Sequence, residues 1–256
     1  MKVSDMALET RTAVVTGAAG GIGTAICRHL LLAGANVAAC DLDGEAVRRL
    51  ASELAGTGTG MVTSHAMDVT DSANVAEVIA AVESDVGPVD ILVNNAGIDK
   101  IEPFLESTEE TWKAVVSVNY LGAVIVTRAV LDGMIARRYG RIVNIASDAG
   151  RVGSSGEVVY SGTKGAIIAF GKALARETAT KGITVNAVCP GPTDTALLKQ
   201  ISDRSQSMYD ALAKAVPMKR IGTPDDIAPA VVFFAGAGAA YITGQTLSVS
   251  GGLTMS

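Results

Sequence analysis

The segment VVYSGTKGA, residues 158–166, places a phenol and an ammonium four positions apart among small side chains. On a helix Tyr160 and Lys164 would share one face, because residues four apart are neighbours there. A phenol has an ordinary pKa of about 10, too high for a base near neutral pH. A positive charge about 4 Å away, at an effective dielectric of about 20, is worth roughly 4 kcal/mol, or about three pKa units. The pair therefore predicts a tyrosine prepared for proton transfer, although a surface tyrosine beside a lysine that extends into solvent fits the pair equally well.

Two more polar residues strengthen the chemical interpretation. Ser147 ends a predicted strand, thirteen residues before Tyr160, and its hydroxyl could bind a substrate oxygen. Asn119 falls inside a predicted helix, where asparagine is a poor choice, so it could hold a water or interrupt the backbone ladder. Taken singly, each of these two residues is also explained by a structural capping role.

A glycine-rich turn follows the first predicted strand. In TGAAGGIG the glycines Gly17, Gly21 and Gly23 stand between this strand and a predicted helix. Glycine allows a tight turn and a close approach of the backbone to a phosphate, and the helix N-terminus supplies free N–H groups and a positive dipole. The turn therefore predicts a pyrophosphate site.

Acidic residues end the second and third predicted strands. Asp41 follows Gly23 by eighteen residues, where a carboxylate is expected to bind a ribose 2′-hydroxyl and to repel a 2′-phosphate. Because residues 18–22 contain no lysine or arginine, this favours NAD over NADP; the alternative is that Asp41 only starts a turn in CDLDG. Asp68 is placed to reach an adenine amine, or else to cap the helix predicted at 72–86.

The elements that must position these residues alternate regularly. Continuous apolar strands are typical of a parallel sheet covered by helices on both faces, with its ligand beyond the carboxyl ends of the strands. We therefore expect one α/β domain over residues 1–256, a doubly wound seven-stranded Rossmann fold. The predicted strands are 12–17, 36–41, 61–69, 89–97, 141–147, 183–191 and 244–252. The predicted helices are 22–35, 43–56, 72–86, 109–138, 158–181 and 223–236, with a weak helical pattern at 199–215.

Composition excludes several other classes. The 256 residues are 48% hydrophobic and 18% charged, with a net charge of −5 and no basic stripe, which argues against a nucleic-acid partner. The N-terminus has no apolar core of a signal peptide, and the most apolar late stretch is too short and too broken to span a membrane. Three cysteines and two histidines are scattered without metal-ligand spacing. We expect a cytoplasmic protein without a metal site.

The motifs together resemble the short-chain dehydrogenase/reductase family. They are TGAAGGIG, NNAG, Asn119, Ser147, the YSGTK form of Y-x-x-x-K, and PGPTDT, and they extend over essentially the whole chain. The resemblance implies that Tyr160 is the acid/base, Ser147 positions the substrate oxygen, and Lys164 binds the nicotinamide ribose while Asn119 holds a relay water. It also implies a homotetramer in which the helices 109–138 and 158–181 pack across subunits. The cofactor residues that it implies are Gly17, Gly21, Ile22, Gly23, Asp41, Asp68, Val69, Asn95, Gly97, Tyr160, Lys164, Pro190, Gly191, Thr193 and Thr195.

A finer resemblance concerns the substrate. NIASDAGRVGSSGEVVYSGTKG, VCPGPTDTALL and ITGQTLSVSGGLT look similar to 2-hydroxycyclohexanecarboxyl-CoA dehydrogenases, which implies NAD-dependent oxidation of a β-hydroxyacyl-CoA with an alicyclic acyl group. Small residues in the loop 148–157 leave room for a ring. We interpret 193–218 as a mobile lid whose cations could meet coenzyme A phosphates or could simply be solvated; they are Lys199, Arg204 and Lys214. The alternatives are a 3-oxoacyl-carrier-protein or general carbonyl reductase, and a non-catalytic NAD-sensing partner subunit.

Overall fold

One parallel sheet organises the chain. The computed structural model describes residues 8–196, 198–199 and 206–255. In these residues seven strands pair in the order β3-β2-β1-β4-β5-β6-β7, and all neighbours are parallel. The strands are β1 Thr12–Thr16, β2 Asn36–Asp41, β3 Val62–Ala66, β4 Val89–Asn94, β5 Gly140–Ile145, β6 Ile183–Pro190 and β7 Thr246–Val249. The order reverses between β1 and β4, and in such sheets this crevice is where ligands bind.

The central strands are apolar because both of their faces are covered. Every residue of β1, β4, β5 and β6 is buried, whereas the edge strands β3 and β7 are only partly covered. One core cluster contains Val15, Ile26 and Val231, and the other contains Val14, Val130 and Ile142. The neighbours Val14 and Val15 of β1 thus point into opposite clusters, as side chains of a strand do. The prediction of a doubly wound seven-stranded parallel sheet is confirmed.

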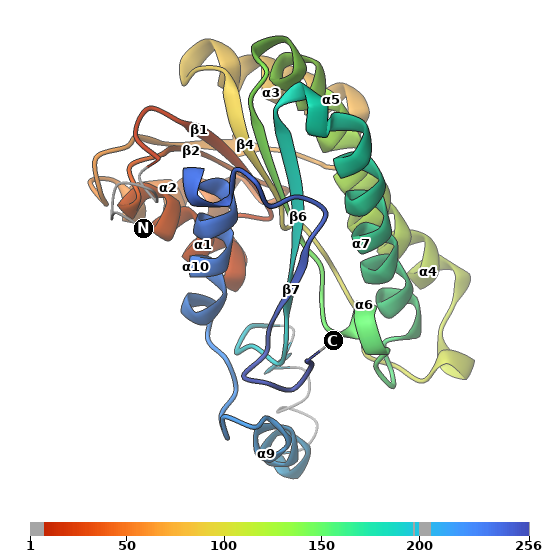
Figure 1. Cartoon of the computed structure of the whole chain (residues 1–256). Coiled ribbons are helices and arrows are strands. Elements are labelled where there is room, and N and C mark those ends of the chain that lie inside the picture. The colour runs from red at the N-terminus through yellow and green to blue at the C-terminus, as the bar shows by residue number, and fades with distance from the viewer. Residues whose placement is uncertain (1–7, 197, 200–205, 256) are drawn as a thin grey trace.

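Helices form a layer on each side of the sheet. In Figure 1 α1 and α10 lie on one side, and α5 and α7 lie on the other. The α-helices of the described residues are α1 Gly21–Leu32, α2 Gly44–Leu54, α3 Ser72–Asp85, α4 Glu109–Val116, α5 Ala123–Arg137, α6 Ala149–Val152, α7 Val158–Thr178, α9 Gln206–Ala215 and α10 Pro224–Ala235. Thr223 precedes α10, and its main-chain N–H and hydroxyl both donate to Asp226, while Pro224 begins the helix as expected.

The structure differs from the expected elements in three places. The helix predicted at 109–138 is divided by a π-helical turn at Ser117–Gly122, which contains Asn119. A Cβ on Gly122 would lie 2.6 Å from Cγ2 of Val69, so close packing requires glycine at the end of this turn. The loop 148–157 contains the short helix α6. Of the weak helical pattern at 199–215, Gln206–Ala215 forms α9 and Lys199 is also helical, while residues 200–205 lie outside the described residues.

One helical stretch is apolar enough to cross a membrane by length and composition alone. It is Glu109–Arg137, which includes the π-helical turn. Val126, Val130 and Met134 of this stretch are buried in the core cluster that packs on the sheet. A core helix of a globular protein meets the same criterion, so this stretch is explained by the sheet that it covers.

Candidate active site

A large cavity opens at the carboxyl ends of the strands. Its volume is about 1280 Å³, and every residue that the sequence analysis assigned to a cofactor lines it. Ser147, which follows β5, and Tyr160 and Lys164, which lie on α7, line the same cavity. The structure therefore brings together the glycine turn and three of the four predicted catalytic residues. Asn119 is the exception, because its side chain lies behind the cavity wall.

The glycine turn is shaped by contacts that leave no room for a side chain. Gly17 has a φ of +62°, and a Cβ on it would lie 2.8 Å from Cα of Ala96. A Cβ on Gly23 would lie 2.2 Å from the carbonyl oxygen of Gly17. Asn95, at the end of β4, fastens the turn by donating from Nδ2 to the carbonyl oxygens of Thr16 and Gly17, at 3.0 and 2.9 Å. Asn95 thus supports the turn as well as lining the cavity.

The start of α1 presents its backbone to the cavity. The first residues of this helix, Gly21, Ile22 and Gly23, line the cavity together with Gly20, which precedes them. The N–H groups at the beginning of a helix have no partner inside the helix and carry a positive partial charge, which suits a phosphate. A tight turn and a helix N-terminus offer N–H donors to a pyrophosphate, and a nearby carboxylate offers an acceptor to ribose hydroxyls, so the residues present fit a dinucleotide.

Asp41 lies where the second strand meets this turn. Its Oδ2 accepts from the main-chain N–H of Ala19 at 3.0 Å, and its Oδ1 accepts from Asp43 at 3.1 Å. The bond to Asp43 forms the local turn expected from the alternative interpretation, in which Asp41 only starts a turn in CDLDG. The bond to Ala19, 22 positions earlier in the chain, also ties Asp41 to the glycine turn. A carboxylate therefore faces the cavity directly beside the expected pyrophosphate site.

Asp68 does not cap the following helix. The carboxylate of Asp71 does so, accepting from the N–H groups of Ala73 and Asn74. Asp68 instead accepts from the main-chain N–H and the hydroxyl of Thr70, and these hydrogen bonds lower the pKa of Asp68 below its usual range. The capping interpretation of Asp68 is wrong, and its carboxylate lines the cavity as a charged group.

Tyr160, Lys164 and Ser147 form the chemical centre of the cavity. The Nζ of Lys164 donates to the carbonyl oxygen of Ile145 at 2.9 Å and lies 5.5 Å from the centroid of the Tyr160 ring. Ser147 lies close enough to the Tyr160 phenol to favour its deprotonated form, and its Oγ accepts from the N–H of Ala149 at 3.1 Å. Lys164 is only 4% exposed, and burial lowers its pKa to about 8.

The expected lowering of the tyrosine pKa by Lys164 is not what the structure shows. Burial raises the pKa of Tyr160 above its ordinary value, the proximity of Ser147 opposes this rise, and the negative charges of Glu157 and Asp99 add to it. Removing the phenol from water disfavours the phenolate more strongly than neighbouring groups stabilise it. The spacing of Tyr160 and Lys164 indicates a nearby ammonium but not the burial of the phenol, which is the larger effect on its pKa.

Asn119 uses its side chain to hold the loop after β4. Its Oδ1 accepts from the N–H of Ile98 at 2.8 Å, and its Nδ2 donates to the Ile98 carbonyl at 2.9 Å and to the Thr163 hydroxyl at 3.3 Å. The residue is 2% exposed. The sequence analysis expected Asn119 to hold a water, but the amide is already committed to these protein groups. Its position in an irregular turn of the helix agrees with the expectation that it interrupts the ladder.

The substrate side of the cavity contains residues that the sequence analysis missed. They share no motif, because they come from loops and from separate short helical segments, and a single apolar or acidic side chain there carries no signal of its own. Among them are Asp99, Val152, Leu198, Leu212, Leu253 and Met255. Four of the six are aliphatic or thioether side chains at or beyond position 198. Two of these, Leu198 and Leu212, belong to the predicted lid, and Leu253 and Met255 belong to the end of the chain, so both segments give the cavity apolar wall.

The segment 193–218 begins inside the site and returns to it. Thr193 is 6% exposed and pairs with Gly222 in a short parallel bridge. Leu198 and, on α9, Leu212 line the cavity. Of the three cations expected here, Lys199 and Lys214 are exposed, and Arg204 lies outside the described residues.

Comparisons with known proteins agree with this geometry. The family model described as enoyl-(acyl carrier protein) reductase matches residues 17–254. The chain is 39% identical over 250 residues to the 3-oxoacyl-[acyl-carrier-protein] reductase FabG of Vibrio cholerae serotype O1, covering 98% of this chain and 100% of that protein. It is 42% identical over 244 residues to the acetoacetyl-CoA reductase of Shinella zoogloeoides, covering 95% of this chain and 98% of that protein.

A solved structure shares the whole fold. It is that of a protein assigned as an NAD(P)-dependent gluconate 5-dehydrogenase from Beutenbergia cavernae, which holds NADP at low occupancy. The TM-score is 0.92 at 35% sequence identity, and the match covers 97% of this chain and 98% of the other. The matched length, the seven-stranded sheet and the serine, tyrosine and lysine at its carboxyl edge lead to one conclusion: the chain belongs to the short-chain dehydrogenase/reductase family, whose members are oxidoreductases.

Proposed function

We propose that the protein is an NAD-dependent dehydrogenase that oxidises a secondary alcohol to a ketone, with a β-hydroxyacyl-CoA carrying an alicyclic acyl group as its substrate. One observation carries the proposal. A single cavity joins the glycine turn and Asp41 at one end to Ser147, Tyr160 and Lys164 at the other. A dinucleotide and an alcohol could therefore meet inside it.

The chain's own residues supply the proton chemistry. Ser147 would donate a hydrogen bond to the substrate oxygen and hold it beside the Tyr160 phenol. Tyr160 would take the hydroxyl proton during oxidation and return it during reduction. Lys164 would hold a ribose and contribute positive charge, and Asn119 would fix the loop at Ile98 against which the reactants lie. Bound NAD would supply the acceptor for the hydride that leaves the substrate carbon, and its positive ring would favour the phenolate.

Asp41 supports NAD rather than NADP. A carboxylate beside the glycine turn can accept hydrogen bonds from ribose hydroxyls but would repel a 2′-phosphate. Residues 18–22 offer no cation to receive such a phosphate. The NAD pool of cells is mostly oxidised, so use of NAD also favours the oxidative direction.

The shape of the substrate side supports an acyl thioester. Small residues near Gly153 and Ser154 leave room for a ring beside Tyr160, and Leu198 and Leu212 offer apolar contacts to an acyl group. Lys199 and Lys214 lie on the proposed lid, where they could contact the phosphates of coenzyme A. Two similar proteins are named as reductases of acyl carrier protein or CoA thioesters.

The test is a comparison of kcat/KM with NAD for 2-hydroxycyclohexanecarboxyl-CoA, for 3-hydroxybutyryl-CoA and for the two corresponding free hydroxy acids. Binding energy from the distant CoA group can be used at the reacting carbon, so the free acids should lose kcat as well as affinity. We expect the alicyclic thioester to be the best substrate by about tenfold or more. Equal efficiency for thioesters and free acids would make a general secondary-alcohol dehydrogenase the better description.

Two other functions are alternatives to the proposed dehydrogenase activity. A 3-oxoacyl-carrier-protein reductase is favoured by the 39% identity to FabG. Such an enzyme would reduce the ketone with NADPH, and its activity would fall when a CoA thioester replaced the carrier-protein thioester or when NADH replaced NADPH. A non-catalytic NAD-sensing subunit is the alternative outside enzymes. The presence of Ser147, Tyr160 and Lys164 together in one cavity argues against it, because a sensor does not need them.

We also infer that the protein is a cytoplasmic homotetramer. Exposed apolar side chains occur along the helices expected to pack between subunits, including Val116 at 37%, Leu121 at 46% and Val158 at 52% exposure. Such side chains are commonly covered in an oligomer. Light scattering at micromolar concentration should give four times the mass of the chain, and a monomer would contradict this.

A further inference from the structure

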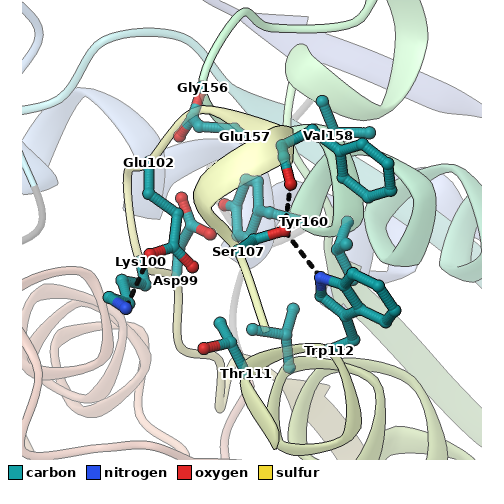
Figure 2. A pocket seen from close by; sticks show the side chains of 13 residues that line it. Asp99, Lys100, Glu102, Ser107, Thr111, Trp112, Gly156, Glu157, Val158 and Tyr160 are labelled. Atoms are coloured by element: carbon teal, nitrogen blue, oxygen red, sulfur yellow. Dashed lines mark hydrogen bonds and ion pairs between the residues drawn. The ribbon is translucent and has the colours of Figure 1, made fainter. Parts of the chain in front are cut away.

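Two carboxyl groups lie on the substrate side of the cavity, and the proposed mechanism uses neither. Asp99 belongs to the loop after β4, and Glu157 is the residue before α7. Both line the large cavity together with Tyr160 and Ser147. They also line a small adjoining cavity of about 20 Å³, whose wall includes Trp112; Figure 2 shows this cavity with Tyr160 facing it.

The two loops that carry these carboxyl groups are joined to each other. The main-chain N–H of Glu102 donates to the carbonyl oxygen of Gly156 at 3.0 Å. Glu102 also forms an ion pair with Lys100 at 2.6 Å, so its charge is compensated within its own loop, as Figure 2 shows. The side chains of Asp99 and Glu157 are therefore placed near each other by fixed backbone rather than by chance.

Each of the two carboxyl groups leaves hydrogen-bonding capacity that the local structure does not use. Glu157 occupies the cap position of α7, yet its side chain makes no hydrogen bond to the N–H groups of that helix. The Oδ2 of Asp99 is buried and has no hydrogen-bond donor. The charge of Glu157 acts on Asp99 instead, so the two side chains lie within electrostatic range of each other.

The charged groups around the pair leave it negative. Burial is the largest effect on Asp99 and the charge of Glu157 the second, and together they raise the pKa of Asp99 to about 7. The main-chain N–H of Lys100 and the ammonium of Lys164 act in the opposite direction. Lys164 donates to the carbonyl oxygen of Ile145 and is itself less basic than an ordinary lysine. The N–H of Lys100 and the ammonium of Lys164 thus compensate the negative charge of the pair only in part. At least the charge of Glu157 remains beside Tyr160.

From this geometry we infer that Asp99 and Glu157 determine specificity by excluding substrates that carry an anionic group close to the reacting carbon, such as the carboxylate of a β-hydroxy acid. A carboxylate placed beside Tyr160 would lie close to at least one negative charge in a partly buried site, where like charges repel strongly. A thioester or an ester at the same position has no charge and is not repelled. The inference rests on the proposed function and sharpens it: the reacting end of the substrate is uncharged, and free hydroxy acids are poor substrates because of these two residues.

The discrimination should depend on pH in a defined direction. A carboxyl group with a pKa raised to about 7 is neutral below that pH and negative above it. The negative charge beside Tyr160 therefore grows as the pH rises from about 6 to about 8, while a carboxylate substrate stays charged throughout. Preference for a neutral substrate should increase over this interval. A residue with a merely structural role would produce no such dependence.

The experiment uses two probes with the same reacting carbon, 3-hydroxybutyrate and its methyl ester, with the whole protein and NAD. The ratio of kcat/KM for ester over acid is measured at about pH 6 and about pH 8. The variants are Asp99→Asn, Glu157→Gln and the double variant, which keep the side-chain shapes. Glu106→Gln is the matched control, because Glu106 is exposed in the same loop and lines neither cavity.

We expect the wild-type ratio to favour the ester and to rise by about tenfold between the two pH values. Asp99→Asn should remove most of this rise, and the double variant should bring the ratio down by about tenfold at the higher pH, mainly through a lower KM for the acid. Glu106→Gln should behave as wild type. If turnover of a probe is too slow to follow, its Kd for the NAD-bound protein by calorimetry replaces kcat/KM. If the double variant has the same kcat/KM and the same Kd for 3-hydroxybutyrate as the wild type, the inference is overturned.

The two proposals fail in different ways. A protein that does not oxidise CoA thioesters, yet discriminates between ester and acid through Asp99 and Glu157, would refute the proposed substrate and leave this inference standing. A protein that oxidises the alicyclic thioester, with the same ester-to-acid ratio in the wild type and the double variant, would refute only the inference.

Discussion

The side-chain amide of Asn119 binds both main-chain polar groups of Ile98, accepting from its N–H at 2.8 Å and donating to its carbonyl at 2.9 Å. A π-helical turn in the middle of an otherwise regular helix presents this amide to the loop after β4. The same loop carries Gly97, where a Cβ would lie 3.3 Å from Nζ of Lys164 and 3.4 Å from Oδ1 of Asn119. The irregular turn thus sets the distance between this loop and Lys164, one of the proposed catalytic residues.

Replacing this amide should therefore affect both stability and rate. Asn119→Ala leaves the two polar groups of Ile98 without their partners, at a cost of about 2 kcal/mol in the free energy of unfolding. We expect kcat to fall by about tenfold or more, while the Kd for NAD changes little. Urea denaturation and steady-state kinetics measure these quantities. Lys113→Ala, at an exposed position of α4, is the control, and equal behaviour of the two variants would contradict the positioning role.

Two glycines of the turn, Gly20 and Gly23, differ in the space that they leave for a side chain. A methyl group on Gly23 would lie 2.2 Å from the carbonyl oxygen of Gly17, whereas one on Gly20 would meet that oxygen at 3.4 Å. Gly23→Ala must displace backbone and should lower stability by about 2–3 kcal/mol and weaken NAD binding by tenfold or more. Gly20→Ala should change the free energy of unfolding by less than about 1 kcal/mol. Similar stabilities for the two variants would show that the turn is more adaptable than its packing indicates.

The order of strands and helices could be predicted from the sequence, because each element has its own local pattern of apolar residues. Runs of apolar residues such as those at 12–16 and 183–190 mark strands that are buried on both faces, and the glycine turn, Asp41 and the Tyr160–Lys164 pair follow from spacing along single elements. The assignment of Asp68 could not be decided in this way, because Asp68 and Asp71 are both suitable caps and only the observed hydrogen bonds distinguish them.

Other features of the site depend on contacts between distant segments. The pairing of Asp99 with Glu157 joins residues from two loops, and neither loop has a pattern that points to the other. Leu198, Leu212 and Met255 line the cavity only because three separate segments meet there, namely the stretch after β6, α9 and the end of the chain. The effect of burial on Tyr160 was missed for the same reason, since desolvation is a property of the surroundings and not of the spacing.

Lys164 should make stability depend on pH. Burial lowers its pKa from the ordinary 10.5 to about 8, so the unfolded chain keeps a proton that the folded protein releases between these values. Stability from this group therefore rises with pH over that interval, by on the order of 3 kcal/mol in full. Chemical denaturation at about pH 7 and about pH 9.5 should show this rise relative to Lys164→Met. Lys172→Met, at an exposed position of α7, should follow the wild type, and a wild-type curve parallel to that of Lys164→Met would refute the assignment.

Asp41 should set the cofactor preference. We expect the wild type to have a higher kcat/KM with NAD than with NADP, because the carboxylate binds ribose hydroxyls and repels a 2′-phosphate. Asp41→Ala should lower the ratio of kcat/KM with NAD to kcat/KM with NADP by about tenfold. The variant should bind NAD more weakly and should no longer repel the 2′-phosphate of NADP. Glu53→Ala, an exposed acid on α2, should leave the ratio unchanged. A wild-type protein that is faster with NADP would show that this interpretation of Asp41 is wrong.

The central claim is that the hydroxyl of Tyr160 moves the proton in an oxidation that uses NAD, and Tyr160→Phe tests it most directly because the change removes only that oxygen. Turnover of the best alcohol substrate is measured together with the Kd for NAD, which a folded protein with an intact glycine turn should retain. The account predicts a fall in kcat of at least about 100-fold with an NAD affinity within about threefold of wild type. A variant that turns over at a rate near that of the wild type, while binding NAD normally, would contradict the account.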